Sequence, residues 1–182
     1  MDDKDLPAAS FYSQAVRSGP LVFTAGHIPI KTLEPGKPLV NSFEDLPLEG
    51  RFLETGRSHP DSRDGPIASQ SWYVYKELER TLLKQGLDLS DTVNATVFLA
   101  DIRDFPTFHR IHNHLFPEQN TALTVSGFDE VGHRGCLIEI ELTASASMKY
   151  FDKDTFEWPV KAPIAAPSAA SAGGFIFYSG VL

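Results

Sequence analysis

The chain has 182 residues, of which 42% are hydrophobic, and it carries a formal net charge of -8 with a pI near 5.2. These values are typical of one globular domain with a sizeable core. The acidic balance argues against a sequence-independent nucleic-acid binder, which needs a basic face to neutralise phosphates. It also argues against anchoring to an anionic membrane surface.

The sequence predicts a reducing compartment, because Cys136 is the only cysteine and no intrachain disulfide can form. The N-terminal Met-Asp-Asp-Lys-Asp lacks the apolar segment of a signal peptide. No stretch approaches the ~20 continuous apolar residues of a membrane span. We therefore expect a cytoplasmic protein.

Two strands, over 10–17 and 20–26, are expected first, joined by a tight turn at Ser18-Gly19-Pro20. Residues 31–66 follow as a long segment rich in Pro, Gly and charged residues. Long segments of this kind are functional lids or solvated loops, and we favour a solvated polar loop. Charged residues crowd its second half: Arg57, His59, Asp61, Arg63 and Asp64.

Apolar residues at helical spacing then predict a helix over 67–85, with Gly86 as its terminating glycine. A strand rich in β-branched residues follows over 92–99. A second helix is expected from Asp104 to about Phe116.

The last expected elements are a strand over 121–126, a loop over 127–135 and a strand over 136–146. The order is therefore β-β-loop-α-β-α-β-β, an α+β fold in which two helices cover one face of a mixed sheet. Residues 147–166, which hold several prolines, are expected to form a linker.

Glu139 and Glu141 are the first candidates for chemistry. They share one face of the last strand, and Ile138, Ile140 and Leu142 share the other. The apolar face must cover the helices, so the two carboxylates look away from that core. They are either solvated or, if another sheet or subunit covers them, partly desolvated with a raised pKa that suits general acid/base work.

Other chemistries have little support. His109 and His112 share a helix face, but a zinc site needs a third ligand that nothing in the sequence places nearby, so we expect no metal. Cys136 has no activating partner. No nucleotide-binding or hydrolase motif is present, so no cofactor is expected.

A short segment near the N-terminus is repeated near the C-terminus. Residues 18–26 align without a gap with residues 172–180, at an offset of 154 positions. Both place a glycine turn before an apolar strand and end on a small residue and Gly. The offset is the size of a domain, which indicates the opening of a second domain copy. Two unrelated hairpins would be the alternative.

The motifs, taken in order, resemble those of the RidA/YjgF family over residues 10–146. The resemblance lies in Tyr12 to Gly19, Leu21 to Pro29, the helix ending at Gly86, Leu89 to Val93, Thr96 to Leu99, Asp104-Phe105, Phe116 to Glu118, and Gly135 to Ala144. It implies a chorismate-mutase-like fold and a homotrimer with ligand clefts between subunits. It also implies hydrolysis of reactive enamines and imines, which releases ammonia and a keto acid.

The resemblance assigns roles to individual residues. Glu139 matches the glutamate that handles water and protons, Tyr12 a cleft tyrosine, and Gly26 a glycine whose backbone lines the cleft. Two departures stand out. Leu123 replaces an arginine that clamps the substrate carboxylate, and Ala25-Gly26-His27 replaces Ser-Gly-Gln. We count Ala25, His27 and Leu123 as expected substrate-binding positions.

Two functions follow from this pattern. The first is an imine or enamine hydrolase with an altered substrate, in which Arg57, Arg63 or Arg134 replaces the missing clamp. The second is a non-catalytic small-molecule-binding trimer, since Leu123 would make the cleft more apolar. A ribonuclease role, attached to the wider family, does not suit the acidic balance.

The expected domains are a RidA-like domain over 1–148, a Pro-rich linker over 149–166 and the opening strands of a second repeat over 167–182. The second repeat keeps the strand alternation of the first. It loses the site residues, because Ala166 and Val181 stand where Tyr12 and His27 stand in the first copy.

Overall fold

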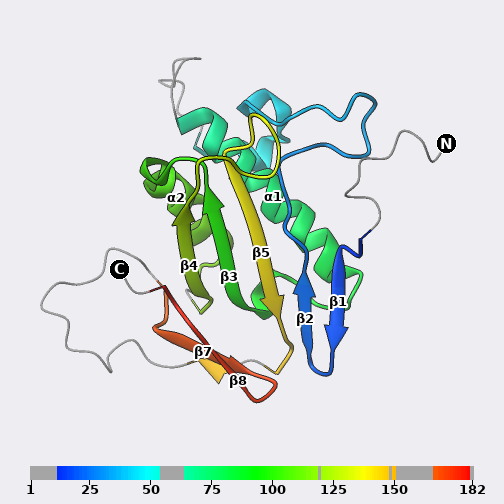
Figure 1. The fold of residues 1–182 in the computed structure, drawn as a ribbon, viewed down its shortest axis with the longest axis vertical. Helices are drawn as coiled ribbons and strands as arrows, with labels where there is room; N and C mark the ends of the chain where they lie inside the picture. The colour runs from blue at the N-terminus through cyan, green and yellow to red at the C-terminus, as the bar shows by residue number, and fades with distance from the viewer. Residues whose placement is uncertain (1–11, 54–63, 119, 148, 151–165, 181–182) are drawn as a thin grey trace, which may run out of the picture.

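The computed structural model describes residues 12–53, 64–118, 120–147, 149–150 and 166–180. Within them, five strands form one mixed sheet in the order β1-β2-β5-β3-β4 (Figure 1). Strands β3 and β4 are parallel, and the other neighbours are antiparallel. Their bounds are β1 Ala15–Ser18, β2 Leu21–Thr24, β3 Thr92–Leu99, β4 Ala122–Gly127 and β5 Ile138–Ala144.

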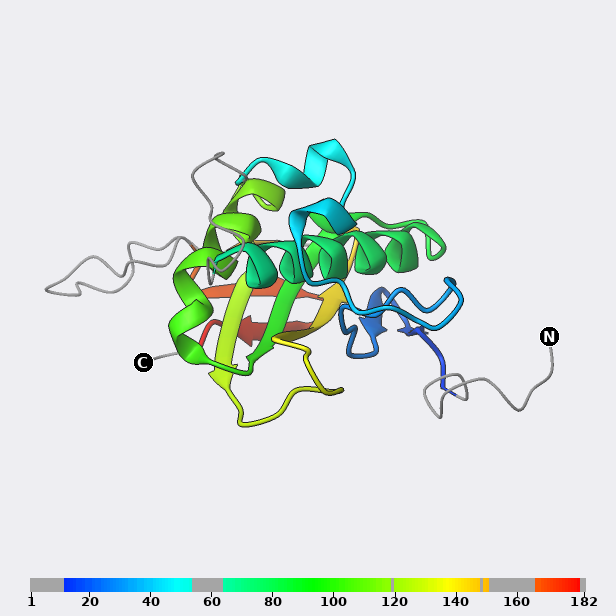
Figure 2. The same cartoon turned by 90° about the horizontal axis from the view of Figure 1, so that it is seen from above.

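Two helices, α1 (Asp64–Leu83) and α2 (Phe105–Leu115), cover one face of this sheet, as the view from above shows (Figure 2). Short 3-10 helices flank them at Phe43–Asp45, Leu48–Arg51, Leu89–Asp91 and Ile102–Asp104. The core between helices and sheet includes the fully buried Leu78, Val97 and Ile140. The predicted α+β arrangement is confirmed. The sheet face turned away from the helices is called the open face below.

The predicted elements agree with the structure to within a few residues, except at the first hairpin. Its strands are shorter than expected, because only four residues on each side of the turn pair. Helix α1 begins at Asp64, inside the segment expected to be a loop. Gly86 follows α1 with a positive φ of 73°, a backbone conformation that glycine adopts without strain.

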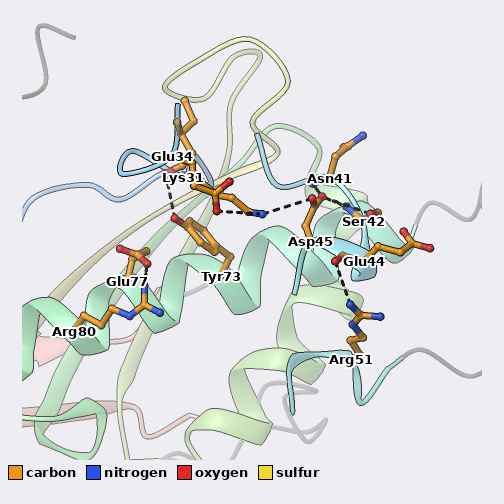
Figure 3. A network of polar contacts seen from close by, with 11 residues as sticks. Lys31, Glu34, Asn41, Ser42, Glu44, Asp45, Arg51, Tyr73, Glu77 and Arg80 are labelled. Carbon is orange, nitrogen blue, oxygen red and sulfur yellow. Dashed lines mark hydrogen bonds and ion pairs between the residues drawn. The ribbon is translucent and has the colours of Figure 1, made fainter. Parts of the chain in front are cut away.

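The described part of the 31–66 segment is only partly solvated, because some of its apolar residues are buried while many of its other residues are exposed. Val40, Phe43 and Leu46 belong to the main core. Polar contacts hold the segment in place (Figure 3): Lys31 lies 3.7 Å from the carboxylates of both Glu34 and Asp45. The Arg57, His59, Asp61 and Arg63 group lies outside the described residues.

A bulge in β3 changes which way one apolar residue points. The register to β5 shifts between Thr92 and Asn94, so Val93 is an extra residue. Bulges of this kind re-aim a side chain. Val93 joins a second, smaller apolar cluster at the end of the open face where β3 and β4 begin, together with Leu21 and Ala122.

A second, three-stranded sheet lies across that end of the first one (Figure 1). It contains β6 (Lys149–Tyr150), β7 (Ala169–Ala172) and β8 (Phe175–Tyr178). Strand β6 falls within the segment expected to be a linker and pairs with β7. Residues 151–165 of that segment lie outside the described residues. None of the described helices is both long and apolar enough to cross a membrane.

Candidate functional site

Glu139 lies on the open face near the start of β5. Its neighbours in the strand, Ile138 and Ile140, are fully buried against the helices, whereas Glu139 is half-buried and Glu141 is exposed. Strand alternation therefore separates the carboxylates from the core, as the sequence predicts.

Two glycine backbones flank the Glu139 carboxylate. A methyl group added at Gly26 would lie 2.0 Å from Glu139 Oε1, and one added at Gly132 would lie 3.3 Å from Oε2. The carboxylate thus occupies the space that side chains at these two positions would fill. Gly132 has a positive φ of 54° in the loop between β4 and β5. Sequence reasoning missed Gly132, although two glycines in that loop, Gly132 and Gly135, were a usable signal.

A backbone bridge holds Gly26 in place. His27 N donates to Ile140 O at 3.0 Å, and Ile140 N donates to His27 O at 3.1 Å. This pairs the segment after β2 with β5, the strand that carries Glu139. The described residues offer the amide N–H of Gly26 no hydrogen-bond acceptor.

Burial raises the pKa of the Glu139 carboxyl, and the nearby charge of Glu141 raises it further. Desolvation disfavours the charged form, and a like charge acts in the same direction. A carboxylate of this kind holds a proton more readily at neutral pH than an ordinary surface glutamate. It can therefore take a proton from water and return it to a leaving group.

Aromatic and aliphatic side chains lie beside this carboxylate. Phe98 is opposite Glu139 in the β3–β5 register, and its ring makes an edge contact with Phe128 at a centroid distance of 5.1 Å. Ile28 approaches Gly132, since a methyl added there would meet its Cγ2 at 2.6 Å. An apolar wall next to one carboxylate suits a small organic ligand.

The structure does not bring every expected site residue to Glu139. Tyr12 is exposed before the edge strand β1, with no hydrogen bond to Glu139. The His27 ring turns toward the helices, where its Nε2 lies 3.2 Å from Thr81 Oγ1 of α1. Burial lowers the pKa of His27. Ala25 contributes its N–H to Gln14 O at 2.9 Å, a bond that closes the first hairpin.

Leu123 also lies away from Glu139. Its register partner on β3 is Ala95, which faces the helices, so the Leu123 side chain belongs to the main core and is 4% exposed. On the open side, β4 presents Ala122, Thr124 and Ser126 instead. None of the three is cationic. Of the replacement clamps considered, Arg57 and Arg63 lie outside the described residues, and Arg134 is exposed two residues after Gly132.

The helix histidines serve packing. His112 is buried, with its Nδ1 2.8 Å from Tyr75 Oη and its ring stacked on Phe116 at 4.6 Å. Burial, and then the neighbouring His109, lowers the pKa of His112 to about 3. Among the described residues, no three His, Cys, Asp or Glu side chains gather in a way that could hold a metal ion.

Stability should therefore depend on pH through His112. The folded state binds its proton less readily than the unfolded state, so stability falls as pH drops from about 6.5 toward 3. One such group contributes a slope of up to about 1.4 kcal/mol per pH unit. His112→Gln retains a partner for Tyr75 and should reduce the slope by about one proton in denaturant unfolding at several pH values. Parallel curves for the two proteins would contradict this.

The chain and its fold match known proteins. The family model described as Endoribonuclease L-PSP matches residues 55–146. A solved Klebsiella pneumoniae structure, provisionally described as an endoribonuclease, is 31% identical, with a TM-score of 0.68, over 74% of this chain and 98% of that one. The chain belongs to the RidA/YjgF family. Its fold is accordingly the chorismate-mutase-like fold of that family.

Relatives with curated names point in the same direction. A RutC family protein of Pyrococcus abyssi is 27% identical over 133 residues, which are 73% of this chain and 84% of that protein. Reactive Intermediate Deaminase A, a chloroplastic protein of Arabidopsis thaliana, is 29% identical over 111 residues, which are 61% of this chain and 46% of that protein. Some members of the RidA/YjgF family are thus named as reactive intermediate deaminases.

Proposed function

We propose that this RidA/YjgF protein hydrolyses reactive enamine or imine intermediates, with Glu139 as the catalytic acid and base. The observation that carries the proposal is the Glu139 carboxylate, half-buried between Gly26 and Gly132 with a raised pKa. The naming of relatives as reactive intermediate deaminases supports it.

The chemistry balances without a cofactor. Glu139 takes a proton from water while the water oxygen attacks the C=N carbon, and it gives that proton to the nitrogen, which yields a neutral carbinolamine. Glu139 then takes the hydroxyl proton of the carbinolamine and delivers it to the nitrogen as the C–N bond breaks, so that ammonia leaves and a C=O product remains. An enamine substrate first takes a proton on carbon and loses one from nitrogen, which converts it to the imine. A partly desolvated carboxylate suits both directions of proton transfer.

The substrate is proposed to differ from that of a member with the arginine clamp. The open side of β4 presents no cation near the site, because Leu123 faces the core. Arg134, exposed in the same loop as Gly132, is the described cation that we propose for any carboxylate contact. Substrates without a carboxylate, or with one placed differently, fit this arrangement.

We further propose that the assembled state is a homotrimer, in which other copies cover the open face and complete the cleft at Glu139. Closure of this kind also protects exposed sheet edges. A cytoplasmic location remains a prediction, and Reactive Intermediate Deaminase A is named as chloroplastic.

The proposed activity is tested by generating 2-imino acids in place with a pyridoxal-phosphate-dependent dehydratase, and carboxylate-free imines with an amine oxidase, and by measuring release of carbonyl product and ammonia with and without the chain. We expect the chain to accelerate hydrolysis of the carboxylate-free imines more than hydrolysis of the 2-imino acids. A thermal-shift screen of 2-keto acids against neutral aromatic metabolites accompanies it. Binding of neutral ligands with no acceleration of any imine would favour the alternative, a non-catalytic binding module.

A further inference from the structure

A small cavity lies between α1 and the loop over residues 30–39, which we call the tongue. Its volume is about 240 Å³, less than the roughly 300–1,000 Å³ of pockets that hold drug-sized molecules. The tongue and the helix each contribute part of its lining, which consists of Lys31, Leu33, Glu34, Tyr73, Glu77 and Arg80. None of these residues belongs to the site at Glu139. The size suits a ligand no larger than an amino acid.

Hydrogen bonds hold the tongue in shape and against the helix. Lys31 N donates to Pro38 O at 3.0 Å across the tongue. Lys37 has a positive φ of 47°, a conformation that few residues other than glycine adopt. The Tyr73 hydroxyl of α1 donates to Ile30 O at 3.4 Å. The fold itself therefore forms the cavity, which lowers the cost of ordering it around a ligand.

Two ion pairs face the cavity from either side of Tyr73 (Figure 3). On the tongue, Lys31 lies 3.7 Å from Glu34, which is beyond the distance of a direct hydrogen bond. On the helix, Arg80 pairs with Glu77. Arg80 is the more open of the two cations, because its side chain is 66% exposed and that of Lys31 is 18% exposed. Charges of both signs thus line one small space.

The oxygen of the Tyr73 hydroxyl lies in a negative environment. Burial raises the pKa of this hydroxyl most, and the charges of Glu77 and Glu34 raise it further, although Arg80 acts in the opposite direction. The hydroxyl therefore stays protonated, donates to Ile30 O, and keeps its oxygen as an acceptor. This oxygen and two carboxylates line the same cavity and supply acceptors for every N–H of an ammonium group.

We propose that this cavity binds the zwitterion of a free amino acid with an apolar side chain. The ammonium group of the ligand lies among Glu34, Glu77 and the Tyr73 hydroxyl. Its carboxylate accepts from N–H groups of Arg80 in a charge-assisted contact. Its apolar side chain covers Leu33, which is 91% exposed at the rim of the cavity. An amine or a carboxylic acid alone would satisfy only half of this arrangement.

The same helix offers a comparison. Lys76 and Glu79 form an ion pair with the same spacing as Glu77 and Arg80, but neither lines the cavity. Lys76 lies instead over the ring of Trp72, at 5.8 Å from its centroid. Exposed ion pairs of this kind contribute little by themselves. The Glu77–Arg80 pair differs because a half-buried phenol and a second ion pair share its cavity.

The test is an NMR titration of the isotope-labelled full chain with L-leucine, which has both charges and an apolar side chain. The matched controls are isocaproate, which lacks the ammonium group, and isopentylamine, which lacks the carboxylate. L-leucine should shift the amide signals of Leu33, Glu34 and Tyr73, and should bind at least about ten-fold more tightly than either control. Equal binding by a control, or unmoved signals at these amides, would overturn the proposal.

Variants locate the binding site. Arg80→Gln and Tyr73→Phe should each weaken L-leucine binding by about ten-fold, because each removes a hydrogen bond to a charged group of the ligand. Lys76→Gln, the matched change on the same helix, should leave the affinity unchanged, and so should Glu139→Gln. Melting curves establish that each variant is folded.

Two results with the variants would contradict the proposal. The first is an affinity that Arg80→Gln and Tyr73→Phe leave intact, or that Lys76→Gln lowers to the same extent. The second is a loss of binding in Glu139→Gln alone, which would place the amino acid at the proposed catalytic site. The proposal does not rest on the proposed function. Because binding is the readout, an inactive chain that binds L-leucine would count only against that function.

Discussion

Glu139→Gln should reduce imine hydrolysis by about 10²–10⁴-fold, the range that a positioned acid/base residue contributes. Glutamine retains the shape between Gly26 and Gly132 but cannot take a proton from water. Stability should not fall, because the raised pKa means that the ionised carboxylate costs stability at neutral pH. Initial rates of keto product formation, with melting curves as the folding control, test this expectation.

Glu141→Gln is the matched control, two residues along the same strand face. It should leave the enzyme active and move the rising limb of the pH–rate profile to lower pH. The reason is that the Glu141 charge raises the pKa of Glu139, and the base must be deprotonated to act. A wild-type rate that Glu139→Gln leaves intact would remove Glu139 from the mechanism.

Gly26→Ala should impair catalysis nearly as strongly, while the fold remains stable. Its methyl group would lie 2.0 Å from Glu139 Oε1, a distance that no real contact allows, so the carboxylate must move. The backbone of Gly26 does not need a positive φ, and the flexible carboxylate can yield at little cost in stability. A displacement of about 1 Å can cost about 10²-fold in rate.

Gly65→Ala serves as the control for an added methyl group. Its methyl would meet only Phe43 at 3.8 Å, an ordinary contact in the first turn of α1. Activity should be unchanged there. Equal activities of the Gly26→Ala and Gly65→Ala proteins would show that the position of the Glu139 carboxylate does not matter.

Pairing between strands that are distant in the sequence explains why the sequence alone does not predict the whole site. Alternation along β5 is a local property, so the sequence alone places Glu139 opposite the core. The face of Leu123 depends on the β3–β4 register, which pairs it with Ala95. A shift of one residue would have turned it to the open face, and no residue in β4 by itself sets that register.

His27 shows a similar limit. Its position one residue after Gly26 suggested a ligand contact, but the ring lies against Thr81 of α1, a residue 54 positions away. Gly132 was not expected at the site, yet it approaches Glu139 because the loop before β5 folds back over the strand. Contacts between distant segments follow from the packing of helix, loop and sheet together, which local patterns do not encode.

By itself, the sequence determined the order of strands and helices, the acidic face of β5, the family and the repeated hairpin. These depend on short-range periodicity and on motifs that are read along the chain. Only the tertiary structure decided which residues surround Glu139 and what covers the open face. The two hairpins have the same strand pattern, yet β1–β2 builds the sheet and β7–β8 packs across it. That difference arises from the partners of each hairpin in three dimensions: β2 pairs with β5 inside the sheet, whereas the end of the second hairpin bonds to Leu123 on β4.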